Sequence, residues 1–283
     1  MSHVGKRAFT LIELLVVIAI VAMLLGILIP ALSNARRYAT SAACLNNERS
    51  MSRAWLLYCE SNENRMPGGA IAPERMYDGF KSVPPGGQGD PDRHRLWVWP
   101  PVDATLAYMG ANGQNPTLED RKRGLERGGL YVYLESIDVF HCPADNEYLR
   151  VPPFRYRGYS IAAGLAVYNT QSEYAKLNEI HSSGDKYVFV EEDYDGAVAN
   201  FNHNAWDFEP WENDFHDPLA LFHNDSSTFG FADGHAEKYK WKDDRTVEYF
   251  TSRSAAIAKY TMPGLAQNNP DLQWLQIHFA YRK

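Results

Sequence analysis

The sequence predicts an α+β protein in which one long N-terminal helix packs on an antiparallel β-sheet whose strands are joined by long loops. Three observations indicate this fold class. Residues Phe9–Ile29 form one apolar stretch, an amphipathic pattern continues it to Tyr58, and Leu221–Trp241 has the turn and alternation of a β-hairpin. The length of 283 residues leaves room for one sizeable domain, or two small ones, behind the apolar helix.

The apolar stretch is long enough to cross a membrane. It holds 21 residues with Glu13 as its only charge, and Lys6 and Arg7 precede it. A helix of this length spans about 31 Å, the thickness of a bilayer's hydrocarbon core. Its Leu, Ile, Val and Phe residues favour insertion by about 7 kcal/mol, against a cost of about 3 kcal/mol for one carboxylate at mid-membrane. We therefore expect a single-pass membrane protein with its basic N-terminus in the cytoplasm.

Two other interpretations of this stretch are open. A secretory signal peptide has a shorter apolar core and then a small-residue cleavage site, whereas here Pro30 and Ala31 run into further helix-forming sequence. A buried helix of a soluble core rarely carries 16 uncharged residues in succession, as Leu14–Ile29 does. The pattern favours a membrane helix over both.

The residues KRAFTLIELLVVIAI resemble the N-terminal signal of type IV prepilins and type II secretion pseudopilins. The resemblance implies that a prepilin peptidase cuts on the cytoplasmic side between Ala8 and Phe9 and methylates the new amino terminus. Glu13 and Pro30 then fall where the family has its acidic residue and its helix-bending proline. The family prefers Gly before the cut, and this chain has Ala8 there.

Glu13 is the candidate assembly residue. An ionisable group within a membrane helix is costly, and its natural partner is a positive charge at similar depth. The resemblance implies that this partner is the N-terminal amine of Phe9 on a neighbouring copy. The alternative is that Glu13 lies one turn from the interface and extends its carboxylate into the headgroup region.

Beyond Pro30 we expect the helix to bend, because proline removes one backbone hydrogen bond. The apolar positions then shift after Asn46–Asn47 to Met51, Ala54, Trp55 and Tyr58, which predicts that the second half of the helix lies on the globular domain. The predicted parts of the chain are a leader peptide (1–8), a transmembrane and assembly helix (9–30), an amphipathic helix (31–66) and a periplasmic α+β domain (67–283).

Residues 68–129 are rich in Gly, Pro and charge, which predicts long loops. Short strands or helices are expected at Leu96–Trp99 and Ala104–Met109. Trp97 and Trp99 alternate as in a half-buried strand, so core packing is the favoured role of their indoles and a stacking platform for sugar is the alternative.

The chain has three cysteines, Cys44, Cys59 and Cys142. Outside the membrane they lie in an oxidising compartment. Cys44 and Cys59 are about 22 Å apart along one helix, too far for a disulfide, so that only Cys142 can pair with one of them. The resemblance of the segments CLNN and CPAD to one pseudopilin-like branch implies that Cys44 is the partner. A metal site at the cysteines is disfavoured, because no CxxC pair exists.

Tyr159–Val167 and Lys186–Val190 have the β-branched and aromatic content of strands. The second runs into an acidic segment, in which Glu191, Asp193 and Asp195 offer oxygen ligands at a spacing of two ahead of a glycine. This arrangement suits Ca²⁺, and the calcium binding of major pseudopilins supports it by resemblance. The spacing is not that of an EF-hand, and a solvated acidic loop is the alternative.

Asp233 and Gly234 give a strong hairpin signal. A three-residue loop with Gly234 in the left-handed region pairs Phe231 with His235, whereas a two-residue loop would invert the buried face. The first register is favoured because it places four aromatic residues on one face: Phe229, Phe231, Tyr239 and Trp241.

His223 stands ten residues before Asp233, and this spacing resembles the prepilin-processing-associated His-x9-Asp-Gly domain, with a hairpin at residues 223–241. The segments FADGH and KYKW and the tail NNPDLQWLQ match as well. His223, Asp233 and His235 with Glu191 or Asp193 could ligate a hydrolytic metal. Structural bracing is favoured, because turn geometry already explains the Asp-Gly pair.

The composition and motifs favour a structural subunit over an enzyme. A formal charge of −7 without a basic cluster argues against nucleic acid, and no nucleophile elbow, phosphate loop or zinc-protease helix occurs. We expect no catalytic residue and no cofactor except possible Ca²⁺.

The predicted function is that of a pseudopilin-like subunit of a bacterial inner membrane, which joins other copies in a type II secretion or type IV pilus-like periplasmic filament. The rival is an envelope carbohydrate-binding or metal-dependent hydrolytic domain on a prepilin-type anchor. Glycan binding that depends on Trp97 or His235 would favour the rival.

Overall fold

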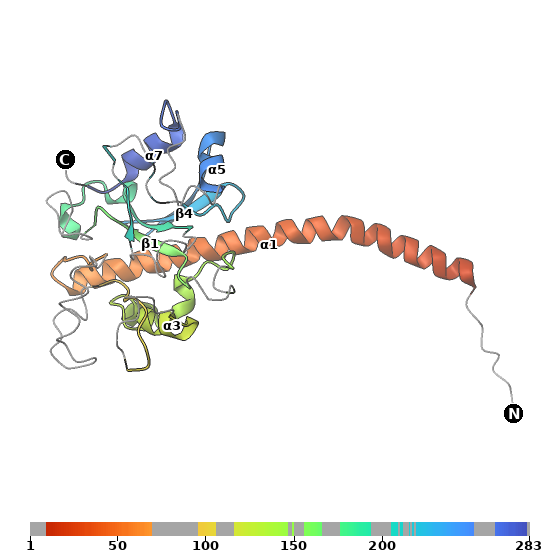
Figure 1. The fold of residues 1–283 in the computed structure, drawn as a ribbon, viewed down its shortest axis with the longest axis horizontal. Helices are drawn as coiled ribbons and strands as arrows, with labels where there is room; N and C mark the ends of the chain where they lie inside the picture. The colour runs from red at the N-terminus through yellow and green to blue at the C-terminus, as the bar shows by residue number, and fades with distance from the viewer. Residues whose placement is uncertain are drawn as a thin grey trace. The chain divides into compact units, whose positions relative to one another are not determined.

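The protein has an α+β fold, as the sequence predicts (Figure 1). The computed structural model describes residues 10–69, 96–105, 116–146, 149, 156–165, 176–193, 205–208, 210–211, 215, 217, 219–251 and 264–281. The chain divides into two compact units, residues 1–39 and residues 40–283.

Helices and strands follow one another in a mixed order. The α-helices are α1 (Leu11–Ser61), α3 (Leu118–Glu126), α4 (Tyr131–Leu134), α5 (Asp244–Thr251) and α7 (Pro270–His278). The short 3-10 helices are η1 (Ile137–Phe140), η3 (Leu177–Glu179) and η4 (Ser183–Asp185). The strands are β1 (Tyr159–Ala162), β2 (Tyr187–Glu191), β3 (Ala205–Trp206), β4 (Ser226–Phe231) and β5 (Ala236–Lys240).

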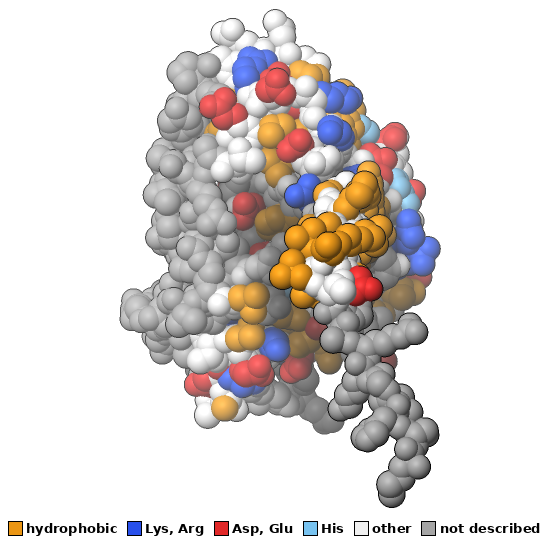
Figure 2. All heavy atoms as spheres, turned by 90° about the vertical axis from the view of Figure 1, so that its right-hand side faces the viewer, with side chains coloured by type: hydrophobic (Ala, Val, Ile, Leu, Met, Phe, Trp, Pro, Cys, Tyr) orange, Lys and Arg blue, Asp and Glu red, His pale blue; other side chains and the backbone are white. Residues whose placement is uncertain are grey.

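Helix α1 is 51 residues long and contains Pro30. It ends at Ser61, five residues before the predicted end at residue 66. In the first unit its large apolar side chains are 46% to 79% exposed between Leu11 and Leu32, and they gather as an orange cluster in Figure 2. By length and composition, it is the one described helix that could cross a membrane.

The five strands form one sheet in the order β3-β1-β2-β4-β5. The pairs β1–β2, β2–β4 and β4–β5 are antiparallel, whereas β1 and β3 run parallel. The sheet is therefore mostly antiparallel, as predicted, with one parallel pair at the β3 edge. A parallel neighbour needs a long connection, and residues 163–204, which include β2, separate β1 from β3 in the sequence.

The hairpin β4–β5 has the predicted three-residue loop. The Phe231 amide donates to the His235 carbonyl over 2.8 Å, and Gly234 has a φ of +89°. Phe229, Phe231, Tyr239 and Trp241 are all buried, which confirms the predicted face. Trp274 of α7 covers this face, with ring centroids 4.9 Å from Phe229 and 4.1 Å from Tyr239.

The opposite face of the sheet receives the second half of α1, as expected (Figure 1). The predicted stripe of Met51, Ala54, Trp55 and Tyr58 is buried. Gly230 permits the close approach, because a Cβ atom there would lie 2.3 Å from the Ser52 hydroxyl. The residues of α1 from Thr40 onward also contact the α4 region, where the rings of Tyr58 and Tyr133 lie 6.5 Å apart.

The segment Leu96–Trp99 differs from its prediction. It forms an isolated bridge between Gly68 and Leu96 instead of a strand or helix. Trp97, Val98 and Trp99 are all buried, so the expected alternation is wrong. The rest of the second predicted element beyond Thr105 lies outside the described residues.

Candidate functional site

Thr10 and Glu13 cap the N-terminal end of α1. The Glu13 carboxylate accepts hydrogen bonds from the Thr10 amide and hydroxyl, each at 2.8 Å, and the Thr10 hydroxyl accepts from the Glu13 amide at 3.3 Å. This reciprocal pair is a capping box, which satisfies backbone donors that the first turn leaves free. Ala8 and Phe9, the predicted processing site, lie outside the described residues.

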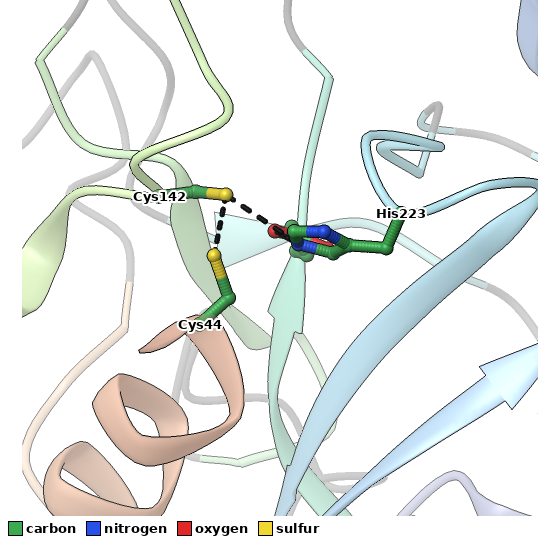
Figure 3. Close-up of side chains that lie close together, drawn as sticks. Cys44, Cys142 and His223 are labelled. Atoms are coloured by element: carbon green, nitrogen blue, oxygen red, sulfur yellow. Dashed lines mark hydrogen bonds and ion pairs between the residues drawn. The ribbon is translucent and has the colours of Figure 1, made fainter. Parts of the chain in front are cut away.

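A second group of functional side chains lies inside the globular unit. Cys44, Cys142, Glu191 and His223 are buried, and their ligand atoms all lie within 4.8 Å of one another. The two sulfur atoms are 2.7 Å apart, and Cys142 Sγ lies 3.5 Å from His223 Nε2. Figure 3 shows the two thiols pointing toward each other and the imidazole reaching toward them. Within the described part of the chain, this is the one group with such convergence of metal-binding atoms.

Four separate segments supply these side chains. Cys44 lies on the buried side of α1, and Cys142 follows η1, where its carbonyl accepts from the Asp145 amide at 2.9 Å. Glu191 is the last residue of β2. His223 lies in the turn before β4, which closes through the positive-φ residues Asn224 and Asp225.

Hydrogen bonds fix the Glu191 carboxylate in this group. Its Oε1 lies 3.0 Å from His223 Nε2, and its Oε2 accepts from the Thr228 amide at 3.2 Å. Both side chains of the Glu191–His223 pair are fully buried. A buried ion pair of this kind is costly to desolvate, so its presence needs a structural or ligand-binding reason.

The two thiols of this group differ in pKa. The hydrogen bond with Cys142 lowers the pKa of Cys44 to about 7, whereas burial raises the pKa of Cys142 above the usual range. Burial disfavours a charged imidazole, but the contacts with Cys44 and Glu191 outweigh it and raise the pKa of His223 to about 10. Glu48, one turn of α1 beyond Cys44, is fully buried, and burial and the charge of Glu191 raise its pKa well above the usual value.

The disfavoured alternative of a hydrolytic centre at His223, Asp233 and His235 does not fit this fold. His223 precedes β4 and the other two follow it, so the strand holds them about 20 Å apart. Asp233 instead accepts from the His235 amide at 3.1 Å and pairs with its ring at 2.5 Å on the exposed loop. His223 and Glu191 of the predicted set do meet, together with two cysteines.

The predicted calcium ligands are not brought together among the described residues. Glu191 is buried against His223, Asp193 is partly exposed, and Asp195 lies outside the described residues. Calcium binding stays a prediction. The expected Cys44–Cys142 disulfide also stays a prediction, because both are free cysteines although their sulfur atoms are close.

Sequence reasoning missed Glu48 and the meeting of Glu191 with the cysteines. Glu48 is one helical turn from Cys44, so a carboxylate on the buried side of α1 was a signal within the sequence. The meeting of Glu191 and Cys142 depends on tertiary structure, which neither residue spacing nor the lack of a CxxC pair addresses.

The prokaryotic N-terminal methylation motif matches residues 5–29. With the apolar helix, this match defines a prepilin-type N-terminus and supports a substrate that is processed for pilus or pseudopilus assembly. It implies processing by prepilin peptidase and is consistent with an inner-membrane anchor. No curated protein and no solved structure matches the chain. The resemblance of His223 and Asp233–Gly234 to the His-x9-Asp-Gly domain stays a prediction.

Proposed function

We propose that this protein is a pseudopilin-like structural subunit of a type II secretion or type IV pilus-like filament. Prepilin peptidase cuts between Ala8 and Phe9, and the mature chain assembles through the first half of α1. The observation that carries the proposal is the methylation motif at residues 5–29, which coincides with an exposed apolar helix that contains one acidic residue.

The apolar half of α1 supports an assembly role. Its side chains are exposed in the described part of the chain, where the window that could span a membrane is 0% buried. In the bilayer, lipid covers them. Leaving the bilayer costs on the order of 7 kcal/mol, and packing of the same side chains between neighbouring copies offsets this cost in a filament.

Glu13 has two roles in this proposal. In the uncut chain its carboxylate accepts from Thr10 at the first turn of α1. After cleavage at Phe9, a new amine lies four residues away in the sequence, and the same carboxylate pairs with that amine on a neighbouring copy. The pairing neutralises two charges that neither lipid nor an apolar helix bundle can solvate.

The globular unit supports a structural role over the rival carbohydrate-binding role. Trp97, a candidate sugar platform, is fully buried, with its ring 5.3 Å from that of Phe189 and 6.3 Å from that of Phe140. A ring enclosed in this way offers no face on which a sugar can stack.

The assembly role is tested with Glu13→Gln and Thr10→Ala. Glutamine preserves the capping-box acceptor but not the charge, whereas Thr10→Ala removes the capping partner and preserves the charge. We expect Glu13→Gln to insert into the membrane, to be cut, and then to be lost from the filament fraction by at least tenfold, while Thr10→Ala still assembles. Intact mass of each variant verifies its cleavage.

Two results would contradict the proposal. Wild-type incorporation of Glu13→Gln would remove the charge pair from the mechanism. Loss of both variants from the filament, with cleavage intact, would assign Glu13 a capping role alone. Glu60→Ala, an exposed acidic residue on the same helix, is the matched control and should assemble normally.

A further inference from the structure

We propose that Cys44, Cys142, Glu191 and His223 form a closed binding site for Zn²⁺ inside the globular unit. The donor atoms are two thiols, one carboxylate and one imidazole, which are the ligand types that Zn²⁺ takes in four-coordinate structural sites. This site is independent of the proposed filament function, and neither depends on the other.

The placement of the donors suits one small ion. All four ligand atoms lie within 4.8 Å of one another, and they come from α1, the segment that follows η1, the end of β2 and the turn before β4. In a tetrahedral site with Zn–S bonds of about 2.3 Å, the two sulfur atoms lie about 3.8 Å apart. They are 2.7 Å apart here, so ion binding moves them apart by about 1 Å.

A disulfide is the competing account, because the two sulfur atoms are close and an exported domain meets an oxidising compartment. A disulfide explains Cys44 and Cys142 alone. It does not explain why a buried carboxylate and a buried imidazole converge on the same sulfur atoms, with Nε2 of His223 at 3.5 Å from Cys142 Sγ and 3.0 Å from Glu191 Oε1. One divalent ion accounts for all four side chains.

The charges of the donor groups and the hydrogen bonds around them also fit an ion. Two thiolates and one carboxylate carry three negative charges, of which Zn²⁺ neutralises two in a region closed to water. The Thr228 amide donates to the second oxygen of Glu191 at 3.2 Å, and the first oxygen, which lies 3.0 Å from His223 Nε2, would exchange that contact for the ion. Such outer contacts orient ligating carboxylates. Glu48, fully buried nearby, has its pKa raised and adds no further charge when protonated.

The ion would fasten α1 to the rest of the globular unit. Cys44 is the first of the four ligands along the chain, and the other three reach it across 98 to 179 residues of sequence. A metal bond across so long a loop constrains the unfolded chain strongly. The site therefore locks the second half of α1 to β2 and to both neighbouring turns.

The test is made on the full chain, purified in detergent with a thiol reductant and without chelator. Elemental analysis and native mass spectrometry should find one zinc ion per chain. Cys142→Ser and Cys44→Ser should each lower bound zinc by at least tenfold, whereas Cys59→Ser should retain it. Cys59 is the matched control, because it is a buried cysteine of the same helix outside the group.

Cobalt supplies a second readout that does not depend on variants. Co²⁺ added to the metal-free wild-type chain should give thiolate charge-transfer bands and the strong visible bands of a tetrahedral ion, and one equivalent of Zn²⁺ should remove both. Absence of bound zinc together with absence of these bands would overturn the proposal. An intact mass lower by two hydrogens, in chain isolated from cells without reductant, would also overturn it by assigning the pair to a disulfide.

Discussion

Single residues decide how closely the elements of the globular unit approach. Gly230 is the sharpest case, because its missing side chain leaves room for Ser52 and for the Glu48 carbonyl, which lie 2.3 Å and 3.1 Å from the position of a Cβ atom. The chemistry of the buried group around Cys44 also depends on single residues. Cys44 and Glu48 are one turn apart on α1, and both the thiol and the carboxylate are buried.

Gly230→Ala should destabilise the globular unit by about 1 to 3 kcal/mol, because one added methyl group forces α1 away from β4. Denaturant unfolding of the detergent-solubilised chain measures the change. The double variant Gly230→Ala/Ser52→Ala removes the nearest obstacle and should recover part of the loss. Equal losses in the single and double variants would show that the contact with Ser52 is not the cause.

Asp120 makes stability depend on pH at the N-terminus of α3. Burial would raise its pKa, but hydrogen bonds from Thr117 and the charge of Arg123 outweigh this and hold the pKa below its usual value of 3.8. A lowered pKa in the folded state means that the contribution is present above pH 3.8 and is lost as the pH falls through the folded value.

Asp120→Asn should therefore cost about 1 kcal/mol near pH 7, and the difference from wild type should shrink below about pH 4. Unfolding free energies across this range measure it. Glu119→Gln, an exposed neighbour in the same turn, is the control and should show a smaller change. A difference that persists unchanged at acid pH would contradict the ionic cap.

Helices α1 and α7 cover opposite faces of the sheet. Asn269 caps helix α7, because its side chain accepts from the Asp271 and Leu272 amides at 2.9 Å and 3.1 Å. Asp271 then holds the chain after β5, because its carboxylate accepts from Tyr239 at 2.9 Å and from the amides of Lys242 and Asp243. The segment NNPDLQWLQ thus caps α7 and also holds the chain after β5 in place.

Asp271→Ala should destabilise the globular unit by about 3 kcal/mol, because it leaves the buried Tyr239 hydroxyl and the partly buried amides of Lys242 and Asp243 without their acceptor. Thermal and denaturant unfolding both measure this. Gln273→Ala changes an exposed residue of the same helix and should stay within about 0.5 kcal/mol of wild type. A comparable small effect at Asp271 would show that its contacts add little.

At the scale of the whole molecule, local patterns predicted much of the fold. The apolar stretch, the shifted stripe on α1, the two central strands and the Asp-Gly loop are set by neighbours in the sequence, and each was predicted correctly. The parallel pairing of β3 and the complete burial of Trp97, Val98 and Trp99 depend on tertiary packing, which periodicity does not encode.

The candidate site shows the same limit. His223 and Asp233 belong to one sequence signature, but strand β4 lies between them. Their side chains therefore do not form one site. Glu191, Cys44 and Cys142 carry no mutual spacing signal, and only the sheet and α1 together bring them within reach. The N-terminal motif could be predicted because its chemistry lies in consecutive residues.

The central claim is that prepilin-type processing creates the assembling end of α1, and mass spectrometry of the N-terminus of the protein isolated from its cells tests it most directly. We predict a chain that begins at Phe9 with a methylated amine, and the uncut form in cells without prepilin peptidase. A chain that still begins at Met1 when the peptidase is present would contradict the account.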